Sequence, residues 1–131
     1  PVTSPEYVRS LLDATTRIAQ AVVLVAVHQG DLVGTVTATE GPPLANIARS
    51  GELEVRMLGV LPAARRHGVA RALMKECERL ARETDRHRIV LSTEPAMVAA
   101  QALYEGLGYV RTPDRDWTIN GFGLITYARA V

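Results

Sequence analysis

Residues 60–70 read Val-Leu-Pro-Ala-Ala-Arg-Arg-His-Gly-Val-Ala, at the point where an apolar strand ends and an amphipathic helix begins. Gly68 and the small Ala70 allow the backbone to approach a ligand closely, and the first turn of a helix has unpaired N–H groups. Together with the helix dipole and the basic side chains within residues 65–71, these groups favour an anion such as a pyrophosphate. An ordinary strand-to-helix turn that contains a glycine is the alternative interpretation.

Hydrophobic periodicity predicts regular elements on both sides of this stretch. Before it, a hairpin turns at Gln29-Gly30, and Pro95 opens a later helix that Gly106 and Gly108 close. The expected elements are a helix over residues 4–20, strands over 22–27, 31–39 and 52–60, a helix over 69–84, a strand over 88–93, a helix from 95, and strands over 109–111 and 123–129 that a polar loop joins.

The order of these elements indicates an α/β fold. The strand–helix–strand segment over residues 52–93 requires parallel pairing of its two strands, whereas the hairpins at the two ends require antiparallel pairing. We therefore expect a mixed, mostly antiparallel sheet flanked by helices. The 131 residues have the length of a single domain.

Composition excludes several classes of protein. Hydrophobic residues make up 47% and charged residues 22% of the chain, which is typical of a globular domain. A net charge of +1 argues against nucleic acid as a partner, and no apolar run reaches the roughly 20 residues that span a bilayer. The single cysteine, Cys77, excludes internal disulfides and multi-cysteine zinc sites, and its place on an apolar helix face predicts a buried side chain. The three histidines lack metal-ligand spacing, and a cytoplasmic location is expected.

Two motifs in this sequence resemble the GNAT superfamily of N-acetyltransferases. The family's loop, Arg/Gln-x-x-Gly-x-Gly/Ala, occurs as Arg-Arg-His-Gly-Val-Ala at residues 65–70, after a strand that ends Leu-Gly-Val at 58–60. The family's late helix occurs as Ala-Gln-Ala-Leu-Tyr-Glu-Gly-Leu-Gly-Tyr at residues 100–109. The match covers residues 22–109 well and the last hairpin more loosely, and the family's first strand would precede Pro1.

This resemblance implies a site for acetyl-CoA. In such proteins the amides of the loop hold the pyrophosphate, and the strand edge at residues 58–60 pairs with the pantetheine arm as another strand would. Met97 stands where many members have an asparagine that contacts the cofactor, so Ser92, Thr93 or the backbone is expected to make that contact. The implied cofactor-binding residues are Leu58, Gly59, Val60, Arg65, Arg66, His67, Gly68, Val69, Ala70 and Arg71.

The resemblance also implies two catalytic residues. Tyr104 matches the tyrosine that protonates the departing thiolate in many members, because a phenol stays protonated at neutral pH. Its place on the apolar helix face also fits a core aromatic residue. Glu54 matches a glutamate that acts as general base in some members, and strand alternation places it on one face with Arg56, Leu58 and Val60, toward the cleft. A salt bridge with Arg56, and deprotonation through ordered water instead, are the alternatives.

The acceptor side of this fold is expected to include Glu94, Asp116 and Trp117. Asp116 and Trp117 would present a carboxylate and an apolar wall to an amine, or they would form a charged loop with the indole folded onto the sheet. The acidic residues at 52, 54, 94, 114 and 116 favour a cationic amine as acceptor.

These features predict transfer of an acetyl group from acetyl-CoA to a primary amine, in a small molecule or a peptide, by direct attack. A non-catalytic acetyl-CoA-binding regulatory or sensor module is the alternative, because it needs the loop but neither Glu54 nor Tyr104. A nucleotide binder has little support, because residues 65–70 lack Gly-x-Gly-x-x-Gly and Gly-Lys-Ser/Thr. Exposed sheet edges favour a homodimer.

Overall fold

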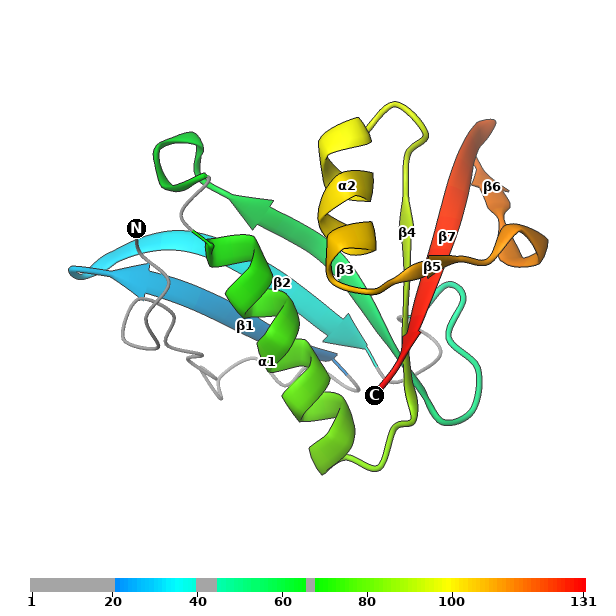
Figure 1. Ribbon diagram of the computed structural model, residues 1–131, viewed down its shortest axis with the longest axis horizontal. Helices are drawn as coiled ribbons and strands as arrows, with labels where there is room; N and C mark the ends of the chain where they lie inside the picture. Colours follow the sequence, from blue (N-terminus) through cyan, green and yellow to red (C-terminus); the bar gives the residue numbers. More distant parts are fainter. Residues whose placement is uncertain (1–20, 40–44, 66–67) are drawn as a thin grey trace.

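The computed structural model describes residues 21–39, 45–65 and 68–131 (Figure 1). The helix expected over residues 4–20 lies outside the described residues, as do Arg66 and His67 of the loop. The elements are β1 (Ala21–His28), β2 (Asp31–Thr39), β3 (Glu52–Val60), the 3-10 turn η2 (Pro62–Ala64), α1 (Val69–Glu83), β4 (Arg88–Thr93), α2 (Val98–Gly106), β5 (Val110–Arg111), the 3-10 turn η3 (Pro113–Arg115), β6 (Trp117–Ile119) and β7 (Phe122–Ala130). In this part of the chain, no helix is long and apolar enough to cross a membrane.

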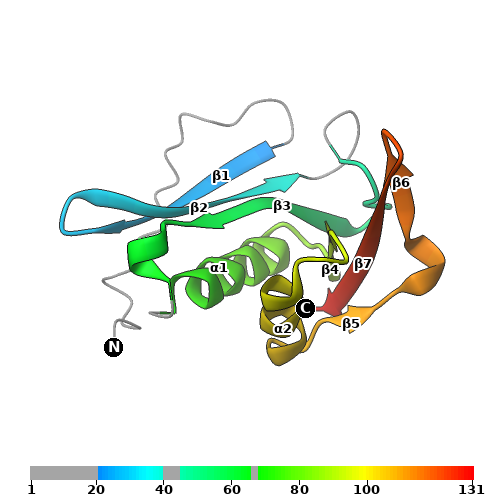
Figure 2. The same cartoon turned by 90° about the horizontal axis from the view of Figure 1, so that it is seen from above.

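The strands form one mixed sheet in the order β1-β2-β3-β4-β7-β5, and β6 pairs with β7. β3 and β4 are parallel, because α1 carries the chain back between them, and the other described pairs are antiparallel. Both helices lie on the same side of the sheet (Figure 2). The predicted mixed, mostly antiparallel sheet with helices is therefore confirmed.

α1 packs on the sheet through the apolar face that periodicity predicts. Val69, Leu73, Cys77 and Ala81 follow one another at intervals of four residues and are all fully or almost fully buried. Gly34 of β2 permits this close packing, because a Cβ atom there would lie 2.9 Å from Val69 Cγ1. The first turn of α1 is thereby held against β2, the neighbour of the strand that leads into the loop at residues 61–68.

Two elements differ from the expectation. α2 begins at Val98 and not at Pro95, because residues 94–97 form a turn in which the Met97 N–H donates to the Glu94 carbonyl at 3.0 Å. The segment expected to be a polar loop contains β6, which pairs with β7 from Trp117 opposite Leu124 to Ile119 opposite Phe122. The two residues between these strands, Asn120 and Gly121, have positive φ angles of 50° and 80°, as a tight two-residue hairpin turn requires.

β3 leaves its neighbour β4 halfway along its length. The parallel pairing covers Glu52–Val55 opposite Arg88–Leu91, and beyond it the described pairing joins β3 to β2 and β4 to β7. β3 also has a bulge, because its three steps from Arg56 to Gly59 oppose two steps from Thr37 to Thr35. The strands therefore splay into a wedge beyond Val55, and β3 and β4 diverge there in Figure 1.

Candidate functional site

The bulge changes which side chains of β3 share a face. Val60 pairs with Gly34, which faces α1, and Val55 pairs with the buried Ala38, so both lie on the helix side. Glu54 alternates with Val55 and therefore lies on the opposite side of the sheet. The expectation that Glu54 and Val60 share one face is wrong, because an extra residue in a strand reverses the alternation beyond it.

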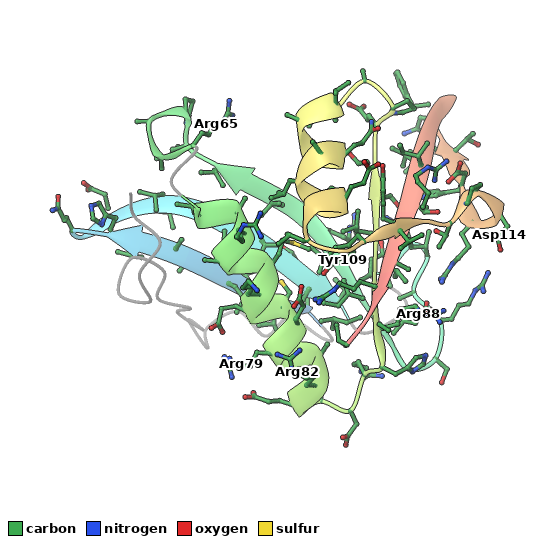
Figure 3. The ribbon with its side chains drawn as sticks, viewed as in Figure 1. Arg65, Arg79, Arg82, Arg88, Tyr109 and Asp114 are labelled. Carbon is green, nitrogen blue, oxygen red and sulfur yellow. The ribbon has the colours of Figure 1, made fainter. Side chains whose placement is uncertain are left out.

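The loop before α1 forms a cavity of about 250 Å³, the donor cavity. Gly68 begins the helix in the left-handed conformation, with φ of 82°, which a residue with a Cβ adopts only with strain. Arg65 lies beside this helix start and donates from Nε to the Val60 carbonyl at 3.2 Å (Figure 3). The cavity is lined by residues that β3, the loop, α1 and α2 contribute: Val60, Ala64, Arg65, Gly68, Val69, Ala70, Arg71 and Leu103.

Six of the ten residues implied to bind acetyl-CoA line this cavity. Leu58 and Gly59 lie on the adjoining strand edge, where a Cβ at Gly59 would meet nothing within 4 Å. Arg66 and His67 lie outside the described residues. Leu103, within the late-helix motif at residues 100–109, is a lining residue that was not among those implied to bind the cofactor.

Tyr104 of α2 lies in a cluster of three tyrosines. Tyr104 is 7% exposed, and its ring centroid lies 6.1 Å from the ring centroids of both Tyr109 and Tyr127. Burial, with a smaller contribution from Cys77, raises the pKa of Tyr104 above its ordinary value. The phenol is therefore protonated throughout the neutral range, as a proton donor needs to be.

Glu54 is buried beneath the segment that follows residue 45. Its Oε1 accepts hydrogen bonds from the backbone N–H groups of Asn46, Ile47 and Ala48 at 2.9, 2.7 and 3.0 Å. Three donors on one oxygen fix the orientation of the carboxylate group. They also hold this segment against β3, so Glu54 shapes the site in addition to lining it.

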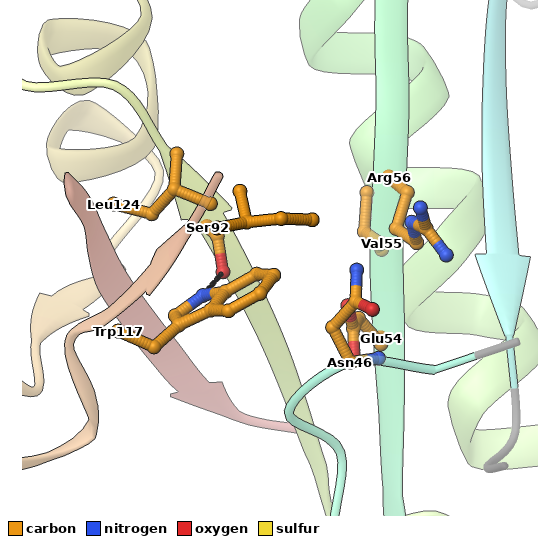
Figure 4. Close-up of a pocket in the computed structure, with 8 residues that line it drawn as sticks. Asn46, Glu54, Val55, Arg56, Ser92, Trp117 and Leu124 are labelled. Carbon is orange, nitrogen blue, oxygen red and sulfur yellow. Dashed lines mark hydrogen bonds between the residues drawn. The ribbon is translucent and has the colours of Figure 1, made fainter. Parts of the chain in front are cut away.

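A second cavity, of about 290 Å³, lies between β3 on one side and β4 with the β6–β7 hairpin on the other. We call it the acceptor cavity (Figure 4). The Trp117 indole forms one wall, and its Nε1 donates to Ser92 Oγ at 2.9 Å. Its polar lining residues are Asn46, Glu54, Arg56 and Ser92, and its apolar lining residues are Val55, Trp117, Ile119 and Leu124. Asn46 and Ile119 were not predicted, because they lie in segments that were expected to be loops. Leu124 was expected only as part of a strand, because nothing in the sequence shows that β6 and β7 fold beside β3.

The other two residues expected on the acceptor side lie elsewhere. Glu94 is exposed just beyond the end of β4, outside the lining of the acceptor cavity. Asp116 binds both terminal nitrogens of Arg111, each at 2.8 Å, and accepts the Thr126 N–H at 2.9 Å. The Arg111 hydrogen bonds are the main reason why the pKa of Asp116 is lowered to about 2. Of the three residues, only Trp117 lines the acceptor cavity.

The ion pair of Asp116 makes the stability of the β6–β7 hairpin depend on pH. Because the pKa falls from 3.8 to about 2 on folding, the contribution is complete above pH 3.8 and is lost as the pH falls toward 2. We expect Asp116→Asn to reduce the slope of unfolding free energy against pH within this window, as measured by urea titration at several pH values. Asp114→Asn is the control, because Asp114 is an exposed carboxylate two residues before Asp116. Equal slopes in the two variants would contradict the assignment of this pH dependence to Asp116.

Arg115 of η3, just before this hairpin, binds the segment that covers Glu54. Its guanidinium donates to both carboxylate oxygens of Glu52, at 2.7 and 3.0 Å, and to the Ile47 carbonyl at 2.7 Å. Burial alone raises the pKa of Glu52, but the hydrogen bonds from Arg115 and the Arg49 N–H, with nearby positive charge, hold that pKa below its ordinary value. Glu52 is therefore occupied by this pair and is not an acceptor-side acid.

Cys77 is fully buried, and burial raises the pKa of its thiol to about 12. The burial confirms the expected place of Cys77 on the apolar face of the helix. A thiol that stays protonated is a poor nucleophile. Among residues 21–39, 45–65 and 68–131, no group of His, Cys, Asp and Glu side chains could hold a metal ion.

The comparisons with known proteins agree with this geometry. Residues 2–109 match the model of the acetyltransferase (GNAT) family. Two curated mouse (Mus musculus) proteins, N-acetyltransferase family 8 members 3 and 7, are each 31% identical over 94 residues, which is 72% of this chain. The chain spans only 41% and 40% of their respective lengths.

Solved acetyltransferase structures share the fold. An IAA acetyltransferase from Bacillus cereus superposes with a TM-score of 0.71 at 17% identity, over 98% of this chain and 93% of its own. A Bacillus anthracis acetyltransferase in complex with acetyl coenzyme A superposes with a TM-score of 0.74 at 16% identity, over 94% of this chain and 69% of its own. The splayed β3–β4 pair, the loop before α1 and the match over residues 2–109 together establish that this chain belongs to the GNAT family of acetyltransferases.

Proposed function

We propose that this protein transfers an acetyl group from acetyl-CoA to a primary amine. The observation that carries this proposal is the wedge between β3 and β4, because the donor and acceptor cavities lie against β3 on opposite sides. The donor cavity lies on the helix side of β3, and the acceptor cavity lies on the other side. A thioester in the wedge would therefore be within reach of an amine in the acceptor cavity.

The residues of the donor cavity fit acetyl-CoA. The N-terminal N–H groups of α1 and the guanidinium groups of Arg65 and Arg71 suit a pyrophosphate. The first turn of α1 contains no acidic residue that would repel it. The edge of β3 at residues 58–60 suits the amide-containing pantetheine arm. The structure of the Bacillus anthracis relative contains acetyl coenzyme A, and we expect the same donor here.

The proposed reaction is a direct transfer. The amine nitrogen forms a bond to the acetyl carbon, the carbon–sulfur bond breaks, and its electron pair stays on the sulfur. Backbone N–H groups at residues 58–60 would polarise the thioester carbonyl. The attacking ammonium first gives one proton to Glu54, directly or through water, and the Tyr104 hydroxyl protonates the departing thiolate. The second proton that the nitrogen loses as the amide forms returns through water to the Tyr104 oxygen. Since the three amides bind Oε1 of Glu54, we assign the proton-accepting role to Oε2.

Calorimetric titration with acetyl-CoA tests the donor site. We expect micromolar binding by the parent protein, and Arg71→Glu to weaken it by about tenfold or more, because it places a like charge beside the pyrophosphate. Lys75→Glu is the matched control, because Lys75 lies one turn further along α1, is also exposed and does not line the cavity. Undetectable binding by the folded parent protein, or equal losses in both variants, would contradict the proposal.

A non-catalytic acetyl-CoA-binding module remains the second candidate. The specific observation in its favour is that Glu54 and Tyr104 both have structural roles, one holding residues 46–48 and the other packing between Tyr109 and Tyr127. Thiol release during incubation with acetyl-CoA and amines separates the candidates. A module that binds acetyl-CoA but releases no coenzyme A with any amine would favour this second function.

A further inference from the structure

The acceptor cavity has one apolar end. The β6–β7 hairpin supplies Trp117, Ile119 and Leu124 to the lining, and Trp117 and Leu124 lie across the cavity from β3 (Figure 4). The hydrogen bond from the indole to Ser92 sets the orientation of the Trp117 ring. Because this hydrogen bond holds the indole in one orientation, the ring offers a flat apolar surface to a ligand.

The charges in the cavity do not suit a polycation. Among its described lining residues, Glu54 supplies the carboxylate, and Arg56 of β3 adds a guanidinium beside it. The other acids that appeared to favour a cationic acceptor lie outside the lining, since Glu52 pairs with Arg115 and Asp116 pairs with Arg111. A second ammonium group on the acceptor would therefore meet an apolar wall or a like charge.

We infer that the acceptor is a primary amine with one positive charge and an apolar group, branched aliphatic or aromatic, and that it is not a polyamine. The amine lies toward Glu54, and the apolar group packs on Trp117 and Leu124. This inference rests on the proposed function for the identity of the cavity. It adds the class of amine that the cavity selects.

Trp117 provides a direct readout, because it is the only tryptophan in the chain. We would titrate the full chain, with coenzyme A present, with 3-methylbutylamine and with 1,4-diaminobutane, and follow tryptophan emission. The two amines have similar length, and one has a branched methyl end where the other has a second ammonium. We expect the apolar amine to bind at least about tenfold more tightly, the selectivity that an apolar pocket provides.

Two variants of β7 assign the binding to this wall. Leu124→Ala should weaken binding of 3-methylbutylamine several-fold and leave that of the diamine unchanged. Phe122→Ala is the matched control, because Phe122 lies on the same strand, is 66% exposed and is not a lining residue. An unchanged affinity in Leu124→Ala, or an equal loss in Phe122→Ala, would overturn the assignment.

Equal or tighter binding of the diamine, or no change in emission with either amine, would overturn the inference. Thiol release from acetyl-CoA is measured separately on the same samples. Selective binding of the apolar amine without thiol release would refute the proposed transfer and leave the ligand class intact. Thiol release that is faster with the diamine would refute the ligand class and leave the transfer intact.

Discussion

Tyr104→Phe is expected to lower the turnover number for acetyl transfer by about ten- to ten-thousandfold, the range for loss of a positioned general acid. The change removes one hydroxyl and keeps the ring that packs against Tyr109 and Tyr127. Affinity for acetyl-CoA and the free energy of unfolding should therefore remain close to those of the parent protein. Turnover is measured as thiol release, and affinity by calorimetry.

Tyr109→Phe is the matched control for this prediction. Its hydroxyl donates toward Glu78 of α1 at 3.5 Å, so it has a structural partner, and its loss should leave the turnover number within about twofold. Full turnover in Tyr104→Phe, under conditions where the chemical step limits the rate, would show that Tyr104 is not the acid. If Tyr104 is the acid, the loss of turnover in Tyr104→Phe should be smaller with thioesters of more acidic thiols, because such thiolates leave without needing a proton.

Arg115→Met is expected to destabilise the protein by about 3 kcal/mol, because it leaves the carboxylate of Glu52 buried without its main partner. The two side chains are 6% and 4% exposed. Arg88 lies 3.5 Å from Glu52 and keeps the loss at the lower end of the range for a broken buried pair. Urea unfolding followed by circular dichroism measures the change.

Arg79→Met controls for the loss of an arginine that pairs with two carboxylates. Arg79 bridges Glu76 and Glu83 on the exposed face of α1, where such pairs contribute up to about 1 kcal/mol. The double variant Glu52→Leu with Arg115→Met should recover much of the stability, since it leaves no buried charge unpaired. Equal losses in Arg115→Met and Arg79→Met would contradict the prediction that the buried Glu52–Arg115 pair contributes more to stability than an exposed pair.

Elements whose signal is local were predictable from the sequence. The apolar face of α1 follows from residues four apart, and the parallel β3–β4 pair follows from the single helix between two strands. β6 was missed although Asn120-Gly121 is a strong hairpin signal, because a three-residue strand is too short to show alternation. The start of α2 was misplaced because Pro95 fits either the first turn of a helix or the turn before it.

The candidate site was predictable only where a motif marks it. Residues 65–71 and Tyr104 stand in recognisable patterns, whereas Arg115 and Glu52 are 63 positions apart and share no pattern. Asp116 has the sequence context of an exposed acid, and its pairing with Arg111 arises only when η3 folds back along β7. The charge of the acceptor cavity could not be predicted either, because it depends on which acidic side chains form ion pairs with arginines that are distant in the sequence.

The β3–β4 junction has a consequence for how the molecule responds to its ligands. Four paired residues on each strand join β1, β2 and β3 to the remainder of the sheet, which makes this junction the narrowest connection between its two halves. A donor against β3 and an acceptor against the β6–β7 hairpin would together bridge the halves where they share the fewest backbone hydrogen bonds. Substrate binding would therefore restrict the motion of the two halves of the sheet relative to each other more than the motion within either half. Product release would restore this relative motion.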